Sequence, residues 1–389
     1  TREEYTYQST VTASKAEKLD YQFISKLPHI TSSTTYLSTY TFNDTMSKGM
    51  TYNKDAVIAV YDSKDAADTT NVNNVDKSGA IAVWKSTDND PNFAVTYGTS
   101  GDDSTMQVAM TKKGLNEINK KYSDKYIVVY YTANVNTDDS VTLGDKGNPN
   151  DVSLTWKRTS TDYYDILKDE CIIYSFGYDL TKKFSDDKGD ATKVKFVIQN
   201  KSDNYYLVAT GSNGVYQITG KSATEEGATQ FSPSAAGKLV INGIEADKYG
   251  FTETHSDAGY SLLKKEIIVN ITSTKAAITP TQANITGIQS KADTDSTAND
   301  GVVNGTALKN DVTVQTTAAS ATVNETKATM TKHGESNNAY VNMEVTNQKQ
   351  FLLPMTGGAG SYALIIAGVV IAGCGFMIVK KNQKRKEIQ

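Results

Sequence analysis

The chain has 389 residues with 40 basic and 44 acidic side chains, and its net charge is −4. Residues 380–389 contribute +4 through five basic side chains and Glu387, so the rest of the chain carries −8. Nucleic-acid binding requires a basic face, and this acidic balance therefore excludes a nucleic-acid partner.

Cysteine usage limits how the chain can be stabilised. The two cysteines are Cys171 and Cys374, and the second lies in an apolar run close to the carboxyl end. If that run is discarded on export, no disulfide forms within the mature chain, and an exported protein then needs another source of stability. The chain begins at Thr1 without a signal peptide, so export implies an upstream segment.

Residues 1–171 alternate apolar and polar side chains with period two, which is typical of strands. The helical spacing of Leu115, Ile118 and Tyr122 predicts one short helix over 111–122, and the Asp/Asn/Gly-rich stretch 137–150 predicts a loop. Abundant tyrosine (23) and scarce proline (6) also favour strands. The predicted strands of this first domain are 19–24, 57–61, 126–131 and 152–156.

Three stretches of this domain resemble the fimbrial isopeptide domain of Gram-positive surface proteins: Ile24–Pro28, Tyr40–Thr45 and Gly147–Asn150. The resemblance implies that Asp44 is the family's carboxylate. The family's bonding asparagine corresponds to Arg158, however, and no lysine stands near residues 5 to 10. We therefore expect this domain to lack a cross-link, and we expect Asp44 and Arg158 to form a charged pair because a lone buried carboxylate is costly.

From residue 172 a second set of strand patterns follows, separated by turn-forming residues. Residues 272–338 are rich in Thr, Ala, Ser, Asn and Asp, and we expect a long insertion of loops or a mobile segment there. The remaining pattern, over 172–350, is that of a β-sandwich. Its predicted strands are 172–182, 194–199, 205–209, 239–241, 249–254, 267–271 and 341–347.

The stretch GKLVINGIEADKYGFTETHSDAGY, residues 237 to 260, resembles the end of a collagen-adhesin B-type (Cna B) domain with its E-box. Ser256 and Asp257 stand where the family has Ala-Pro. The resemblance implies that Glu253 promotes an isopeptide bond between Lys182 on the first strand and Asn347 on the last. The residues that fit the motif are Gly237, Leu239, Ile241, Gly243, Tyr249, Glu253, Thr254, Gly259 and Tyr260.

Strand alternation supports the same three residues without the family. Side chains two apart share a face, so Lys182 lies with Leu180, Glu253 with Phe251, and Asn347 with Val345. Burial lowers the pKa of an amine and raises that of a carboxyl group, which favours a neutral nucleophile beside a proton carrier. The alternative is a plain Lys182–Glu253 ion pair without a covalent bond.

The carboxyl end reads Leu353-Pro354-Met355-Thr356-Gly357, then an uncharged apolar run over 362–379, then the basic tail 380–389. The run is long enough to cross the roughly 30 Å hydrocarbon layer as a helix, and the basic tail fits the cytoplasmic side. A buried core helix is the alternative. The three parts together resemble the L-P-x-T-G sorting signal of Gram-positive surface proteins.

That resemblance implies transpeptidation by a sortase, which cleaves after Thr356 and joins Thr356 to an amine of peptidoglycan or of a neighbouring pilin subunit. Signatures of an enzyme acting on other molecules are thin: no HExxH, CxxC, phosphate-binding glycine loop or G-x-S-x-G stands in the chain. The acidic clusters lack calcium-loop spacing, so no metal or other cofactor is predicted. A surface hydrolase is therefore disfavoured.

The sequence thus predicts an all-β protein of tandem immunoglobulin-like sandwiches, 1–171 and 172–350, followed by a sorting segment, 351–389, with a transmembrane helix. Function is predicted to be structural, as a wall-anchored pilus subunit stabilised by its own isopeptide bond. The alternative is a wall-anchored adhesin that does not polymerise and binds a host or matrix ligand.

Overall fold

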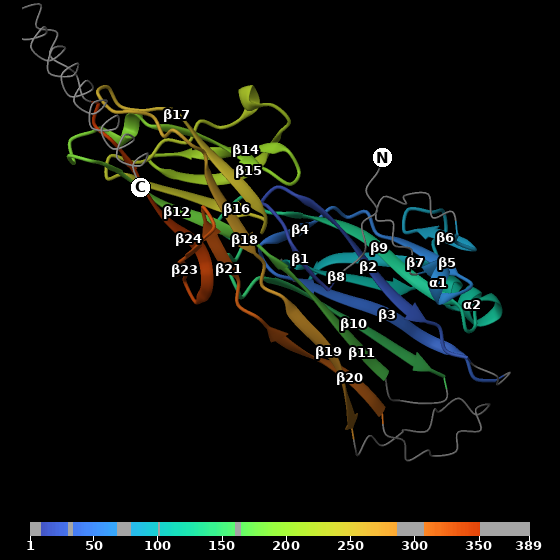
Figure 1. Ribbon diagram of the computed structural model, residues 1–389. Coiled ribbons are helices and arrows are strands. Elements are labelled where there is room, and N and C mark those ends of the chain that lie inside the picture. The colour runs from blue at the N-terminus through green and yellow to red at the C-terminus, as the bar shows by residue number, and fades with distance from the viewer. Residues whose placement is uncertain are drawn as a thin grey trace, which may run out of the picture.

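The computed structural model describes residues 9–29, 34–67, 79–99, 102–159, 165–285 and 307–350. Figure 1 shows two β-rich lobes lying next to each other, which confirms the all-β prediction. No helix among these residues is long and apolar enough to cross a membrane. The predicted span 362–379, the sorting motif 353–357 and the basic tail lie outside the described residues.

The first lobe consists of two packed sheets. One has the strand order β2-β9-β5-β6, with β4 also paired to β9; the other has the order β19-β20-β11-β10-β3-β8-β7, with β1 on β11. Aromatic side chains fill the space between them, and the rings of Phe23 and Phe42 from opposite sheets lie 6.1 Å apart. The bounds are β1 Thr10–Thr12, β2 Lys18–Lys26, β3 Leu37–Met46, β4 Met50–Tyr52, β5 Val57–Tyr61, β6 Ala82–Lys85, β7 Phe93–Thr99, β8 Asp102–Met110, β9 Tyr126–Val135, β10 Asn148–Arg158, β11 Asp165–Tyr174, β19 Ala276–Ile285 and β20 Ala307–Thr316.

The second lobe is one long sheet folded over its own core, in the order β22-β21-β18-β17-β13-β14-β15-β16-β12-β24-β23. Tyr178 of β12 packs edge-on against Phe251 of β17 with ring centroids 4.8 Å apart, so these strands face each other across the core. The bounds are β12 Phe176–Phe184, β13 Lys195–Asn200, β14 Tyr205–Ser212, β15 Val215–Ser222, β16 Lys238–Ile244, β17 Lys248–His255, β18 Ile267–Thr272, β21 Ser320–Val323, β22 Thr326–Ala328, β23 Met330–His333 and β24 Ser336–Asn347.

Helices are short and few among the described residues. The predicted helix is confirmed as α2, Lys112–Lys121, and Thr111 caps it by accepting a hydrogen bond from the Gly114 amide at 3.2 Å. Its apolar side packs onto the first lobe, where Ile118 is buried. The others are α1, Lys64–Ala67, and the single 3₁₀ turns η1, Ala191–Lys193, and η2, Glu225–Gly227.

Two strand predictions are wrong in detail. The stretch 172–182 is not one strand, because the chain passes from β11 of one lobe to β12 of the other at Ser175, whose hydroxyl donates to the Ala13 carbonyl at 2.6 Å. The insertion 272–338 is not mainly loop in its described part, since β19 and β20 pair over ten positions and β21 to β23 follow. Threonine-rich segments form strands here because neighbouring edges supply hydrogen-bond partners.

The β19–β20 hairpin connects the lobes. It leaves the second lobe after β18, and β20 then pairs in parallel with β11 of the first lobe at Ile166 and Lys309. Figure 1 shows the hairpin lying beside β11 and β10. The second half of the sequence therefore completes a sheet of the first half.

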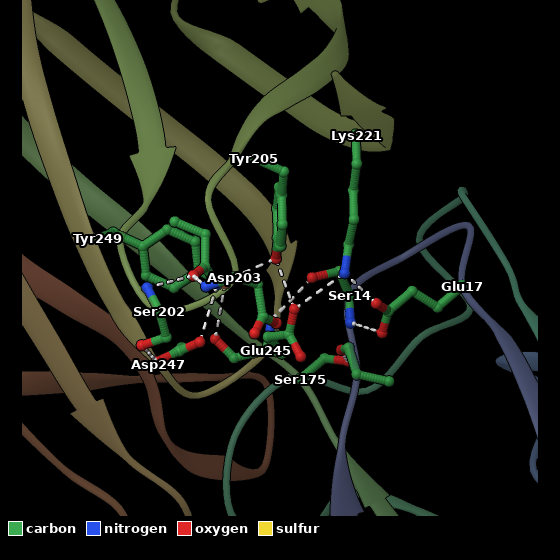
Figure 2. Close-up of polar contacts among 12 residues, drawn as sticks. Ser14, Glu17, Ser175, Ser202, Asp203, Tyr205, Lys221, Glu245, Asp247 and Tyr249 are labelled. Carbon is green, nitrogen blue, oxygen red and sulfur yellow. Dashed lines mark hydrogen bonds and ion pairs between the residues drawn. The ribbon is translucent and has the colours of Figure 1, made fainter. Parts of the chain in front are cut away.

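A charged network joins the lobes near the end of β16 (Figure 2). Lys221 of β15 pairs with Glu245 of its own lobe at 3.1 Å and with Glu17 of the first lobe, and its ammonium lies 4.1 Å from the Tyr205 ring centroid. Burial raises the pKa of Glu245, and the charge of Glu17 adds to that effect. One lysine thus balances carboxylates from both lobes.

Lys15 of the first lobe is buried against the second. Its ammonium donates to the Asp138 carbonyl at 2.7 Å and to the Gln217 side chain, and its stem crosses Gly243. Gly243 has φ +91°, and a Cβ there would lie 2.2 Å from the Lys15 Cγ. Gly243, which belongs to the stretch 237–260, therefore lets the Lys15 side chain pack closely where the two lobes meet.

Asp145, in the loop between β9 and β10, fastens the opposite side of the junction. Its carboxylate accepts hydrogen bonds from the Ala319 amide at 3.0 Å, from the Asn338 side chain at 2.6 Å and from the Thr274 hydroxyl. All three donors belong to the second lobe. Hydrogen bonds to a charged acceptor are the stronger kind, so this residue contributes to fixing the angle between the lobes.

We predict that Asp145→Ala loosens the junction and destabilises the protein by about 2 kcal/mol, because the Ala319 amide and the Asn338 side chain lose a charged partner. Hydrogen exchange should accelerate at the Ala319 amide. Glu226→Ala, an exposed carboxylate in the η2 turn, is the control and should change neither quantity. Unchanged exchange at Ala319 in the Asp145 variant would contradict this role.

Candidate functional site

Lys182 and Asn347 lie on neighbouring strands at the same end of the second lobe. β12 and β24 pair in parallel, with Lys182 opposite Val345 and Phe184 opposite Asn347. Asn347 therefore stands two positions beyond the residue opposite Lys182, on the same face as Val345. As strand alternation predicts, Lys182 and Asn347 are buried, at 4% and 1% exposure.

A tight turn holds the backbone of Lys182. Its amide donates to the Gly237 carbonyl at 2.7 Å, and Gly237 has φ +78°. A Cβ at Gly237 would lie 2.4 Å from the Lys182 carbonyl oxygen, which no L side chain tolerates. The glycine that opens the quoted motif thus allows β16 to approach β12 at Lys182.

Glu253 reaches the pair from β17 across the core. Its Oε1 accepts a hydrogen bond from Asn347 Nδ2 at 2.8 Å and lies 3.8 Å from Lys182 Nζ. Its Oε2 accepts from the Leu263 amide at 2.8 Å. The side chains of Lys182 and Glu253 are both fully buried. The structure therefore brings the three residues together in the buried core of the second lobe.

The surroundings of Lys182 favour its neutral form. Burial lowers the pKa of its amine to about 8, and the Glu253 carboxylate offsets part of that effect. The amine donates to the carbonyls of Lys183 at 3.1 Å and Val345 at 3.4 Å, and it lies 4.9 Å from the Phe184 ring centroid. A neutral amine is a nucleophile, so this environment favours the reactive form of Lys182.

The amide of Asn347 is held by its nitrogen. Nδ2 donates to Glu253 Oε1 and, at 2.6 Å, to Ser256 Oγ, whereas the buried Oδ1 has no hydrogen-bond partner. An unpaired buried carbonyl is costly in a finished core. The arrangement places a carboxamide and an amine beside the same carboxyl group, and these are the three groups that an isopeptide reaction uses.

The first lobe contains a different buried polar cluster, around Asp44 of β3. Its Oδ2 accepts from the hydroxyls of Tyr52 at 2.8 Å and Tyr131 at 3.0 Å, and Asn150 donates to the Tyr131 hydroxyl at 2.9 Å. Asp44 Oδ1, Asn150 Oδ1 and the Tyr21 hydroxyl are buried without partners. Burial raises the pKa of Asp44 to about 7, and the hydrogen bonds from these neighbours only partly oppose it.

The predicted Asp44–Arg158 pair is wrong. In the pairing of β10 with β3, Asp44 stands opposite Val152, six positions from Arg158, which is about 20 Å along a strand. The Arg158 guanidinium instead lies 5.9 Å from the Trp156 ring centroid. Asp44 is accommodated by two tyrosine hydroxyls rather than by a cation.

Sequence reasoning missed Asn150 and Ser256. Asn150 was assigned to a loop, although it shares strand parity with Leu154, and that alternation was the available signal. Ser256 was noted only as a departure from the E-box, and its contact with Asn347 depends on a turn that no local pattern reveals. Lys15 is the buried lysine that follows residues 5 to 10 in the sequence, and its ammonium donates to Gln217 rather than to Asp44.

Comparisons with known proteins support the predicted sorting segment at the carboxyl end and the predicted fold. Residues 345–387 match the family model described as the LPXTG cell wall anchor motif. The chain therefore ends in a sortase signal and is a cell-wall-anchored surface protein. No curated protein sequence matches the chain.

Solved structures of pilins are similar to the chain. The pilus 2b backbone protein of group B streptococcus is 16% identical with a TM-score of 0.52, over 87% of this chain and 96% of that one. Domains D2 and D3 of the major pilin SpaD from Corynebacterium diphtheriae are 14% identical with a TM-score of 0.48, over 87% and 97%. At such identity the likeness to the group B streptococcus protein shows a shared fold.

We predict that the stability of the first lobe falls as pH rises from about 4 to 7. The Asp44 carboxyl is protonated in the folded state up to about pH 7 but ionises near pH 4 when unfolded, so folding takes up a proton in this window. The loss is on the order of 4 kcal/mol. Asp44→Asn should flatten the pH dependence of thermal unfolding, and exposed Asp65→Asn should leave it intact. A wild-type stability that rises over this window would refute the assignment.

Proposed function

We propose that this protein is a sortase-assembled pilus subunit whose second domain, 172–350, is locked by a covalent bond between Lys182 and Asn347. The observation that carries the proposal is the buried contact set in which Glu253 lies 3.8 Å from Lys182 Nζ and accepts from Asn347 Nδ2. The shared fold with a pilus backbone protein and the wall-anchor motif support the same reading.

The bond forms by transamidation within the folded chain. Neutral Lys182 Nζ attacks Asn347 Cγ, and Glu253 moves one proton from Nζ to Nδ2. The Cγ–Nδ2 bond then breaks, ammonia leaves, and an Nζ–Cγ amide remains. Glu253 contacts both reacting side chains in the core, so the fold holds them near the group that carries the proton.

The position of the bond suits a load-bearing subunit. Asn347 stands six residues before Leu353 of the sorting motif, and Lys182 lies on β12, which follows directly from β11 of the first lobe. Tension applied at Thr356 passes through Asn347 to Lys182 and then along β12 into the first lobe. The covalent path through the bond bypasses the 164 residues between its two ends (347 minus 182, minus 1).

The bond also adds thermodynamic stability. It closes a loop of 165 residues (347 minus 182), and by analogy with disulfide loop entropy it stabilises by about 5 kcal/mol. Cys171 forms no disulfide. Among the described residues, the proposed bond between Lys182 and Asn347 therefore takes the place of a disulfide.

We predict that the purified protein is lighter than its sequence by one ammonia, and that Glu253→Ala restores the sequence mass. The variant should also unfold at lower temperature and be cleaved faster by protease, because the loop closure is lost. Glu266→Ala, a half-buried carboxylate paired with Lys201, is the control and should keep the mass deficit. A wild-type mass equal to the sequence mass would leave only a buried ion pair.

We predict that cell-wall extracts contain a high-mass ladder of this protein, because sortase joins Thr356 to an amine of the next subunit. Thr356→Ala should abolish both the ladder and wall attachment, whereas Thr346→Ala, outside the motif, should change neither. An immunoblot that shows one wall-attached species instead of a ladder would identify an adhesin that does not polymerise. Attachment of the Thr356 variant would contradict the sortase step itself.

A further inference from the structure

A serine that the isopeptide assignment does not use touches the nitrogen that has to leave. Ser256 follows directly after β17, and its Oγ accepts a hydrogen bond from Asn347 Nδ2 at 2.6 Å. Glu253 holds the same nitrogen on its other side at 2.8 Å. The two N–H bonds of the amide therefore point at two different acceptors.

The turn that carries Ser256 is fastened to the strand end that carries Asn347. The Gln350 amide donates to the Gly259 carbonyl at 2.7 Å, and the Ser261 amide donates to the Gln348 carbonyl at 2.9 Å. Asp257 also accepts from the Asp190 amide at 2.8 Å. These contacts fasten the chain after Ser256, and the pairing of His255 with Lys195 fastens the residue before it, so the backbone that carries the hydroxyl is held on both sides.

Ser256 differs from the rest of the cluster in its exposure. Lys182, Glu253 and Asn347 are buried, whereas Ser256 is half-buried at the edge of the core. The amide nitrogen becomes ammonia, a polar product that has to reach solvent. Among the contacts of Nδ2 in the described structure, the one with Ser256 leads toward the surface.

We propose, on the basis of the isopeptide reaction above, that Ser256 assists cross-linking by holding the departing nitrogen of Asn347. In the ground state the hydroxyl oxygen fixes the rotation of the amide, so that its Cγ faces Lys182. When the Cγ–Nδ2 bond breaks, the Ser256 oxygen accepts a hydrogen bond from the forming ammonia. The ammonia then leaves toward solvent on the side of Ser256. The serine ends with the proton it started with, and the atom balance remains one amide formed and one ammonia released.

The substitution pattern at this position gives a direct test. Ser256→Ala, which restores the E-box residue, removes the acceptor and should slow cross-linking by about tenfold, the effect of one lost hydrogen bond. Ser256→Thr retains a hydroxyl and should restore a rate close to wild type. Ser185→Ala, a serine beside Asn347 whose hydroxyl contacts the Lys349 amide instead, is the matched control and should react at the wild-type rate.

The rate is measured on the full chain made by cell-free synthesis. Samples are quenched in denaturant at intervals after synthesis stops, and the loss of ammonia is followed by intact mass. To separate chemistry from folding, Ser256→Ala is also placed in the unreactive Glu253→Ala chain, where it should leave the rate of folding unchanged.

The two proposals fail in different ways. If wild type never loses ammonia, the isopeptide assignment itself is wrong. If wild type reacts but Ser256→Ala reacts equally fast, or Ser256→Thr is as slow as Ser256→Ala, the role of the serine is overturned while the cross-link stands. If adding Ser256→Ala to the Glu253→Ala chain slows its folding, the serine acts on folding, which also overturns its proposed role.

Discussion

The structure of the second lobe depends on one constraint: an amine and a carboxyl group that are both charged and fully buried lose their hydration, and this costs free energy of folding. Lys182 and Glu253 have no exposed side-chain surface, and at 3.8 Å they are too far apart for a strong hydrogen bond. The proposed conversion of the amine to an amide would remove the charge and would use the Asn347 side chain that lies beside Glu253. In this proposal, a destabilising buried pair is replaced by a covalent bond.

The first lobe also buries a carboxyl group, that of Asp44, and no covalent bond is proposed there. Asp44 is as deeply buried as Glu253, but Tyr52 and Tyr131 donate to it, and its raised pKa lets it remain protonated near neutrality. No described lysine contacts it. Stability of this lobe comes instead from aromatic packing and from β20, a strand that the second half of the sequence supplies. The charged contacts of Lys221 and Asp145 also join the two lobes, although only one of them holds the proposed cross-link.

Strand alternation was enough to orient the key side chains, because period two fixes which residues face the core. It placed Lys182, Glu253 and Asn347 inward, and the contacts among them follow from how three strands meet. It also placed Asp44 inward but failed for Arg158, because contact along paired strands depends on register, which a single sequence does not specify. The β19–β20 hairpin could not be predicted for a related reason: its Thr- and Ala-rich strands are stabilised by the edge strand β11, and the paired residues Ile166 and Lys309 are 143 positions apart in the sequence (309 minus 166).

The most direct test of this account is to identify the cross-linked peptide. Wild-type protein released from the wall is digested, and tandem mass spectrometry is used to search for a branched species that joins the peptide containing Lys182 to the peptide containing Asn347. The account predicts this species, with the link between Nζ and the former side-chain amide, and predicts that the two linear peptides are scarce. Recovery of both linear peptides in full yield, with an unmodified Lys182 and an intact Asn347, would contradict it.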